Sequence, residues 1–298
     1  MGYYIGIDGG GTKTTAAVAD DNGLMFKKEG KSINFYSVGM ECARENLRAV
    51  VGEIEAELKT DSFEAAVIGC SALDGEAEGE LINELCGGVI NAQKIKMTSD
   101  VHIALESVGE SACPCVAVCG TGSMAVGRDC NQNILIAGGW GHIVGDEGSA
   151  YAIAIDGLKL CCEECDKGEN TPLLKSATEF FGVDDFRNAI DVIYSPETTK
   201  DVIAAFASCV GKLAEKGDEA ATEILTRQAE KFAQTVLTLL NKIKLCDTLG
   251  LYGGVLKNNP LFTEVFSEKI KEKYPETKII LLDTPPEESA MKLARKMI

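Results

Sequence analysis

Residues able to contact a polyphosphate occur near the start of the chain, in the segment 8–14, which reads D-G-G-G-T-K-T. It follows the apolar stretch 3–7 and precedes the small and β-branched residues 15–19, which predicts a strand, turn and strand. Glycines let backbone amides approach phosphates closely because they lack a Cβ atom. The phosphate contacts expected in this loop are Gly9, Gly10, Gly11, Thr12 and Lys13, with Asp8 orienting a hydrated magnesium ion.

Two better-known phosphate motifs do not fit this loop. Gly6 and Gly11 have the spacing of a Walker motif, but Thr12 stands where that motif needs lysine. A Rossmann fingerprint needs a helix after the glycines, whereas the segment 14–19 favours a strand. A tight hairpin without a ligand is the structural alternative, although three consecutive glycines exceed what a hairpin turn needs.

A second glycine turn, G-T-G-S at 120–123, follows the apolar stretch 116–119. Strand, turn and strand here repeat the layout of the first thirty residues, which indicates an internal duplication with one phosphate loop in each half. Such a turn is common between strands, so its meaning depends on the pairing with the first loop. The phosphate contacts expected here are Gly120, Thr121, Gly122 and Ser123.

Asp100 follows a predicted buried strand over 94–98 and begins a predicted helix. Ligands of α/β sheets bind beyond the carboxyl ends of strands, which places Asp100 where chemistry usually occurs. Phosphoryl transfer to a hydroxyl needs a carboxylate that accepts the proton of the attacking alcohol, and Asp100 is the candidate catalytic base. Capping of the helix by Ser99 or Asp100 explains the same residues equally well.

The segment 138–151, G-G-W-G-H-I-V-G-D-E-G-S-A-Y, holds the single tryptophan, one of two histidines and five glycines. An aromatic ring beside backbone donors and acidic side chains suits a sugar, because its apolar face stacks while its hydroxyls bond to carboxylate. Asp146 could instead cap the helix that follows, and Trp140 could belong to a core.

These candidate residues must be positioned by alternating strands and helices, which specify a mixed α/β sheet. Apolar spacing predicts an amphipathic helix over roughly 40–59, and the region from about 146 to 244 is predicted to be mostly helical. The other expected elements are strands at 24–28, 65–70, 124–127, 130–137, 249–252 and 278–282, and helices at 78–86, 218–244 and 287–297, with a helix beginning at Pro260.

Composition narrows the classes of function. The chain has 298 residues, 45% hydrophobic and 25% charged, which is typical of a globular protein long enough for two lobes. A net charge of -17 disfavours nucleic acid and anionic membrane as partners. The chain has no long apolar run and no cationic leader, so we expect neither a membrane span nor a secretory signal, and a cytoplasmic location.

Twelve cysteines are a high number, and without a signal peptide they indicate reduced thiols. Most are expected to be small buried hydrophobic residues. One cluster, Cys161, Cys162 and Cys165, contains a C-x-x-C spacing, but no second pair supplies the further ligands of a zinc or iron–sulfur site. Whether this cluster binds anything is left open by the sequence.

The segment 138–151, together with the D-G-G-G-T-K-T opening and the C-G-T-G-S turn, resembles the N-acetylglucosamine kinase branch of the BadF/BadG/BcrA/BcrD ATPase family. This family lies within the sugar kinase, heat-shock 70 and actin superfamily. The resemblance implies an α/β protein of two ribonuclease-H-like lobes, as in actin-like ATPases, with ATP and magnesium in a cleft between them. The expected lobes are 1–108, joined by a terminal helix 287–298, and 109–286 with a helical insertion.

The resemblance also implies the activity, which is transfer of the γ-phosphate of ATP to the 6-hydroxyl of an amino sugar by a homodimer. N-acetylglucosamine is the first choice of substrate, with glucosamine and N-acetylmuramic acid as the others. By the same resemblance Asp100 is the catalytic base, and Thr12 and Thr121 contact phosphate. Sugar contacts are implied for Asn34, Gly139, Trp140, Gly141 and Asp146, and an adenosine-side turn for Gly253 and Gly254.

Two other functions remain as alternatives. The broad family includes ATP-driven activators of 2-hydroxyacyl-CoA dehydratase or benzoyl-CoA reductase systems, which carry an iron–sulfur cluster between two subunits. The many cysteines suit that reading, whereas the tryptophan-containing segment does not. A sugar sensor without catalysis is the other alternative, although it would be expected to lack Asp100, which is present.

Overall fold

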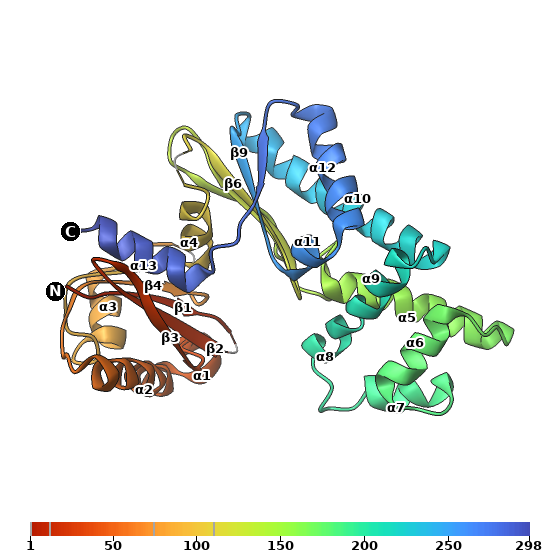
Figure 1. Cartoon of the computed structure of the whole chain (residues 1–298), viewed down its shortest axis with the longest axis horizontal. Coiled ribbons are helices and arrows are strands. Elements are labelled where there is room, and N and C mark those ends of the chain that lie inside the picture. Colours follow the sequence, from red (N-terminus) through yellow and green to blue (C-terminus); the bar gives the residue numbers. More distant parts are fainter. Residues whose placement is uncertain (1, 12, 74, 110) are drawn as a thin grey trace. The chain divides into compact units, whose positions relative to one another are not determined.

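The computed structural model describes residues 2–11, 13–73, 75–109 and 111–298. Thr12, predicted to contact phosphate, lies outside these residues. The chain divides into two compact units, which are Met1–Gly109 with Leu282–Ile298, and Glu110–Leu281. Figure 1 shows the elements of each unit.

The first unit is built on a mixed sheet in which the described residues form five strands in the order β3-β2-β1-β4-β5. The strand β1 pairs antiparallel with β2, and β2 with β3, while β1, β4 and β5 are parallel. The bounds are β1 (Tyr4–Gly9), β2 (Lys13–Asp20), β3 (Gly23–Lys31), β4 (Phe63–Cys70) and β5 (Ala92–Thr98).

Helices cover both faces of this sheet (Figure 1). On one face Ile5 and Ile7 pack in a core with residues of α2 (Met40–Leu58) and α3 (Gly79–Cys86). The other face packs against α4 (Asp100–Glu106) and α13 (Pro286–Lys296). Gly6 permits this, because a Cβ atom at Gly6 would lie 2.0 Å from the backbone nitrogen of Met291.

The second unit repeats the topology of the first. Its described strands have the order β8-β7-β6-β9-β10. The strand β6 pairs antiparallel with β7, and β7 with β8, while β6, β9 and β10 are parallel. The bounds are β6 (Pro114–Cys119), β7 (Ser123–Arg128), β8 (Ile134–Gly138), β9 (Thr248–Tyr252) and β10 (Lys278–Leu281). The duplication expected from the two glycine hairpins and the mixed α/β class are therefore confirmed.

The predicted start of one strand was wrong. The segment 130–133 was predicted to be extended, but β8 begins at Ile134. The Asp129 carboxylate accepts hydrogen bonds from the backbone N–H groups of Asn131 and Asn133, both at 2.8 Å. These bonds close a turn before the strand can begin.

Helices make up most of the remainder of the second unit. The first unit has one further short helix, α1, besides those already described. Ser149 begins α5, because its side chain accepts a hydrogen bond from the backbone N–H of Ala152 at 3.1 Å. The bounds are α1 (Phe35–Val38), α5 (Ala150–Lys167), α6 (Pro172–Phe181), η1 (Phe186–Asn188), α7 (Ala189–Ile193), α8 (Lys200–Ala205), α9 (Ala207–Glu215), α10 (Glu219–Ile243), α11 (Gly254–Asn258) and α12 (Pro260–Lys273). Among the described residues, none of the helices is long and apolar enough to cross a bilayer.

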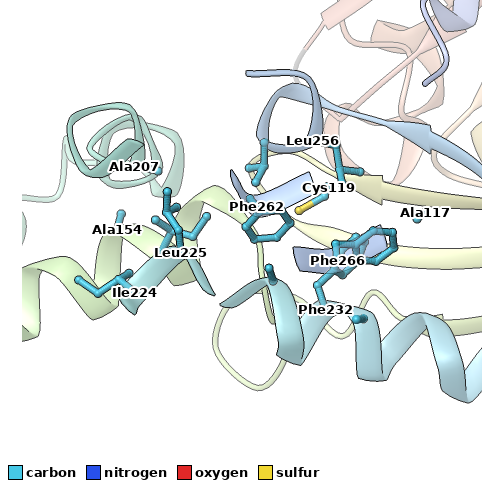
Figure 2. Close-up of a cluster of buried hydrophobic side chains, with 14 of the residues drawn as sticks. Ala117, Cys119, Ala154, Ala207, Ile224, Leu225, Phe232, Leu256, Phe262 and Phe266 are labelled. Carbon is cyan, nitrogen blue, oxygen red and sulfur yellow. The ribbon is translucent and has the colours of Figure 1, made fainter. Parts of the chain in front are cut away.

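The core of the second unit joins its sheet to these helices. Figure 2 shows Phe232 of α10 beside Phe262 and Phe266 of α12, close to Cys119 of β6. The rings of Phe232 and Phe266 stack with centroids 5.2 Å apart. This packing fixes the carboxyl end of β6, and with it the glycine turn that follows.

Candidate active site

Three parallel strands of the first unit end at one edge of the sheet. Asp8 on β1 is in register with Gly69 on β4, and Gly69 is in register with Thr98 on β5. Asp100 follows directly at the start of α4. A Cβ atom at Gly69 would lie 2.9 Å from the Ile103 side chain, so glycine here lets α4 approach the strand ends.

The two carboxylates at this edge interact electrostatically. Burial, followed by the nearby carboxyl groups of Asp100 and Glu287, raises the pKa of Asp8 to about 6. Burial also raises the pKa of Asp100, although a hydrogen bond from the Val101 backbone N–H at 2.8 Å opposes that rise. Two acidic groups with raised pKa values at strand ends are typical of a functional site.

The Asp8 carboxylate at this edge has the donor chemistry that a magnesium ion prefers. Mg²⁺ is usually held by one or two carboxylates together with substrate phosphates and water. Asp8 supplies such a hard oxygen donor. Within the described part of the chain, no group of three or more His, Cys, Asp or Glu side chains could hold a metal ion, so the donor set does not form an all-protein cage.

Asn34 lies at the same end of the first unit, where it begins α1. Its Oδ1 atom accepts hydrogen bonds from the backbone N–H groups of Tyr36 and Ser37, and its Nδ2 atom donates to Ser71 Oγ at 3.0 Å. Ser71 follows β4, and its own backbone N–H donates to the Gly9 carbonyl at 2.9 Å. Ser71 therefore connects Asn34 to the first glycine loop, a role that our reading of the sequence missed.

The glycines of the first loop have different surroundings. A Cβ atom at Gly9 would lie 2.4 Å from the Ile33 side chain, and one at Gly10 would lie 3.2 Å from the Lys13 carbonyl, whereas space is open around Gly11. The ammonium group of Lys13 forms an exposed ion pair with Glu29 at 2.7 Å. The Lys13 side chain is thus paired with a carboxylate of β3. The phosphate contact expected for Lys13 stays a prediction.

The second glycine loop is held against the start of α5. The carbonyl of Gly120 accepts from the Ala150 backbone N–H at 2.8 Å, and that of Thr121 accepts from the Tyr151 N–H at 3.4 Å. Within the loop, the Gly120 N–H donates to the Gly122 carbonyl at 2.9 Å. The turn is therefore preorganised by the helix end.

A cavity of about 530 Å³ opens beside this loop in the second unit. Gly120 and Thr121 line it together with Gly254 of α11. Gly253 has a φ of 117°, and a Cβ atom there would lie 2.3 Å from the Cys119 carbonyl, so α11 can approach β6 only because this residue is glycine. The other lining residues are Ala150, Ala204, Ala205, Ala207, Ser208, Gly211, Lys212, Glu215, Val255, Asn258 and Asn259.

Asp146 joins the second loop to the tryptophan-containing segment. Its Oδ1 atom accepts from the Gly141 backbone N–H at 3.2 Å, and its Oδ2 atom would lie 2.7 Å from a Cβ atom at Gly122. Asp146 is buried and has a φ of 58°, a conformation that non-glycine residues rarely adopt. Strain of this kind in a buried carboxylate is common at functional sites.

A second cavity, of about 260 Å³, lies at the start of β7. Ser123, Trp140 and Asp146 line it together with residues of β8 and α10. Trp140 is 77% exposed, and the backbone of Gly139 and Gly141 beside it has φ values of 73° and 85°. Of the four predicted sugar contacts of this unit, Trp140 and Asp146 therefore line this cavity.

The structural alternatives for these residues have different outcomes. Ser99 caps α4, with its side chain accepting from the His102 N–H, while the Asp100 carboxylate accepts from the backbone N–H of its neighbour Val101. Ser149, and not Asp146, begins α5. The exposure of Trp140 excludes a place in the core. Capping is thus confirmed for Ser99 at α4, whereas Ser149 and not Asp146 caps α5.

The duplicated sheet topology, with a glycine-rich hairpin after the first strand of each repeat, defines the actin-like ATPase class. The family model of the BadF/BadG/BcrA/BcrD ATPases matches residues 5–290. The chain belongs to this family.

Individual relatives extend over the whole chain. An N-acetylmuramic acid/N-acetylglucosamine kinase of Clostridium acetobutylicum is 31% identical, covering 99% of both chains. An N-acetyl-D-glucosamine kinase of Dictyostelium discoideum is 28% identical, covering 98% of this chain and 97% of its own. A solved candidate N-acetylglucosamine kinase of Chromobacterium violaceum has a TM-score of 0.74 at 18% identity over 99% of both chains, which shows the shared fold.

Proposed function

We propose that this protein is an ATP-dependent kinase that phosphorylates the 6-hydroxyl of N-acetylglucosamine. The observation that carries the proposal is the pair Asp8 and Asp100 at the parallel strand ends, where burial raises the pKa of both carboxyl groups. The match over the full length to kinases acting on N-acetylated amino sugars supports this substrate class.

The chemistry follows from the residues of the first unit. Asp100 accepts the proton of the sugar 6-hydroxyl as its oxygen attacks the γ-phosphorus. The new O–P bond forms as the bond from the γ-phosphorus to the bridging oxygen breaks, and ADP leaves. A bound magnesium ion would neutralise charge on the phosphates, and Asp8 is the residue that would orient it, through water.

Each unit contributes one glycine hairpin to ATP binding in this proposal. Thr12 and the glycines 9–11 belong to the first, and the residues 120–123 belong to the second. The 530 Å³ cavity takes the adenosine, because Gly254 lines it beside Gly120 and Thr121. Lys212 and Glu215 of α9 are the charged lining residues available to ribose hydroxyls.

Sugar recognition is assigned to Asn34 in the first unit and to Gly139, Trp140, Gly141 and Asp146 in the second. Trp140 is exposed and stacks on the apolar face of the sugar, while Asp146 accepts from a hydroxyl through its remaining lone pairs. The Clostridium relative is named for both N-acetylmuramic acid and N-acetylglucosamine, so both belong in the substrate panel, with glucosamine as the third.

An assay of ADP release against a panel of hexoses and amino sugars tests the proposal. We expect turnover to need an N-acetylated amino sugar and to fall about 10²- to 10⁴-fold in Asp100→Asn. Asp129→Asn is a control, because that carboxylate only closes the β7–β8 turn. Turnover that is indifferent to every sugar would instead favour the activator of a dehydratase or reductase.

We further propose that the two compact units correspond to the two lobes expected from the sequence, and that the enzyme is a cytoplasmic homodimer. Light scattering should give twice the mass of one chain. Limited proteolysis should cut near residues 109–110 and 281–282 before it cuts within either unit. A monomeric mass would overturn the dimer and leave the proposed reaction intact.

A further inference from the structure

Four cysteines of the second unit lie together at the open end of the β6–β7 hairpin. Cys113 and Cys115 are at the start of β6, Cys130 is in the turn after β7, and Cys246 precedes β9. The sulfurs of Cys113 and Cys130 are 2.7 Å apart. The thiol of Cys115 is hydrogen-bonded to that of Cys246. None of these residues is among those proposed to bind ATP or the sugar.

The backbone on both sides of the closest pair is held in place. The Asp129 carboxylate accepts from Asn131 and Asn133 and so fixes the turn that carries Cys130. On the other side, the Asp247 carboxylate accepts from Ser111 Oγ and from the Ala112 backbone N–H. The short separation of the two sulfurs is thus built into the local fold.

We infer that Cys113 and Cys130 form a reversible disulfide when the protein is exposed to peroxide. A disulfide bond is about 2.05 Å long, so the two sulfurs need only a small further approach. Cys130 is exposed and can meet the oxidant, whereas Cys113 is fully buried behind it. An accessible thiol beside a partner that resolves it is the arrangement of redox-sensitive cysteines.

The reaction is balanced by one peroxide molecule. Peroxide first converts the Cys130 thiol into a sulfenic acid, and one water molecule leaves. The Cys113 sulfur then attacks the Cys130 sulfur, so that the S–S bond forms, the S–O bond breaks and a second water leaves with the Cys113 proton. The two thiols lose two electrons in total, and a small-molecule thiol can return them by exchange.

The hydrogen bond with Cys130, followed by burial, raises the pKa of Cys113 to about 11. The first attack on peroxide is therefore assigned to Cys130, because the thiolate is the reactive form and Cys113 seldom reaches it. The bond would close the end of a hairpin whose other end is the turn 120–122.

The test is peroxide treatment of the full chain, followed by alkylation in denaturant and peptide mass spectrometry. We expect the loss of two of twelve alkylatable thiols, a linked peptide pair containing Cys113 and Cys130, and recovery with dithiothreitol. Cys130→Ser and Cys113→Ser should each abolish the link. Cys162→Ser, which removes another exposed thiol, should leave it unchanged.

Several outcomes would overturn the inference. One is a folded wild-type protein, verified by circular dichroism, that keeps all its thiols or whose Cys130 proceeds to sulfinic acid without a link. Another is a link between Cys115 and Cys246 in place of the expected one. Stoichiometric zinc in the purified protein, lost in Cys130→Ser, would equally replace the disulfide by a metal site. These readouts do not depend on kinase activity.

Discussion

Asp8, which we propose to orient the magnesium ion, lowers the stability of the folded chain at neutral pH. Its pKa is raised to about 6 by burial and by the carboxyl groups of Asp100 and Glu287. A carboxyl group whose pKa is raised by folding binds its proton more tightly in the folded chain. Its contribution to stability is therefore full below the unfolded pKa of about 3.9 and is lost as the pH rises through about 6.

The variant Asp8→Asn should consequently be more stable than the wild type at pH 8, by on the order of 2–3 kcal/mol, and the difference should vanish near pH 4. Urea unfolding between pH 4 and 8 measures this. Asp20→Asn is the control with opposite sign, because hydrogen bonds from Asn22 and Gly23 lower the pKa of Asp20. A difference between Asp8→Asn and the wild type that does not change with pH would contradict this account. Despite its stability, Asp8→Asn should lose kinase activity.

Trp140 should act on sugar binding alone. Trp140→Ala removes an exposed ring, so folding should be unaffected, while KM for the sugar should rise about 10-fold and KM for ATP should stay unchanged. Steady-state kinetics with each substrate varied in turn measures both constants. Ile143→Ala is the matched control, since Ile143 is 85% exposed on the same segment. An equal rise in both KM values would argue against stacking by Trp140.

At the scale of elements, the terminal helix α13 depends on one glycine of β1. A Cβ atom at Gly6 would lie 2.0 Å from the Met291 nitrogen and 2.3 Å from the Glu287 carbonyl, and both atoms belong to backbone that cannot move away alone. Gly6→Ala should therefore cost at least about 3 kcal/mol, as overpacking does in a tight core.

Gly52→Ala provides the comparison for that variant. Gly52 lies in the middle of α2 with open space around it, so alanine should stabilise the chain by about 0.5–1 kcal/mol. Chemical denaturation of the two variants gives both values. Equal effects of the two substitutions would mean that α13 does not pack on β1 as described.

Much of this architecture could be predicted because its signals are local. Apolar spacing located α2 and α10 to within one or two residues, and the two glycine turns were enough to indicate the repeat. The start of β8 could not be read in this way, since apolar and polar residues in 130–137 gave no sign that Asp129 closes a turn.

Contacts of the site were harder to predict because they join residues distant in the sequence. Ser71 meets Asn34 only after β4 has paired with β1. One signal was available, since Ser71 follows a buried strand just as Asp100 does. Asp146 was identified as a candidate from the sequence. Its contacts with Gly122 and Gly141 depend on the left-handed backbone of Asp146 itself, which no local sequence pattern predicts.

At the scale of the whole molecule, one topology occurs twice, and the proposed mechanism gives each copy a different role. The first unit supplies the carboxylates Asp8 and Asp100, and the second supplies Trp140 and the cavity beside Gly120. A net charge of -17 adds no general attraction for phosphate, so in this account the nucleotide relies on backbone amides and on magnesium.

Phosphorus NMR of the reaction of ATP with N-acetylglucosamine tests the central claim most directly. We predict that the wild type forms ADP and a phosphomonoester at the sugar 6-position in equal amounts, and that Asp100→Asn, verified as folded, forms neither at a comparable rate. Formation of ADP with inorganic phosphate and no sugar phosphate, for any sugar of the panel, would contradict the account.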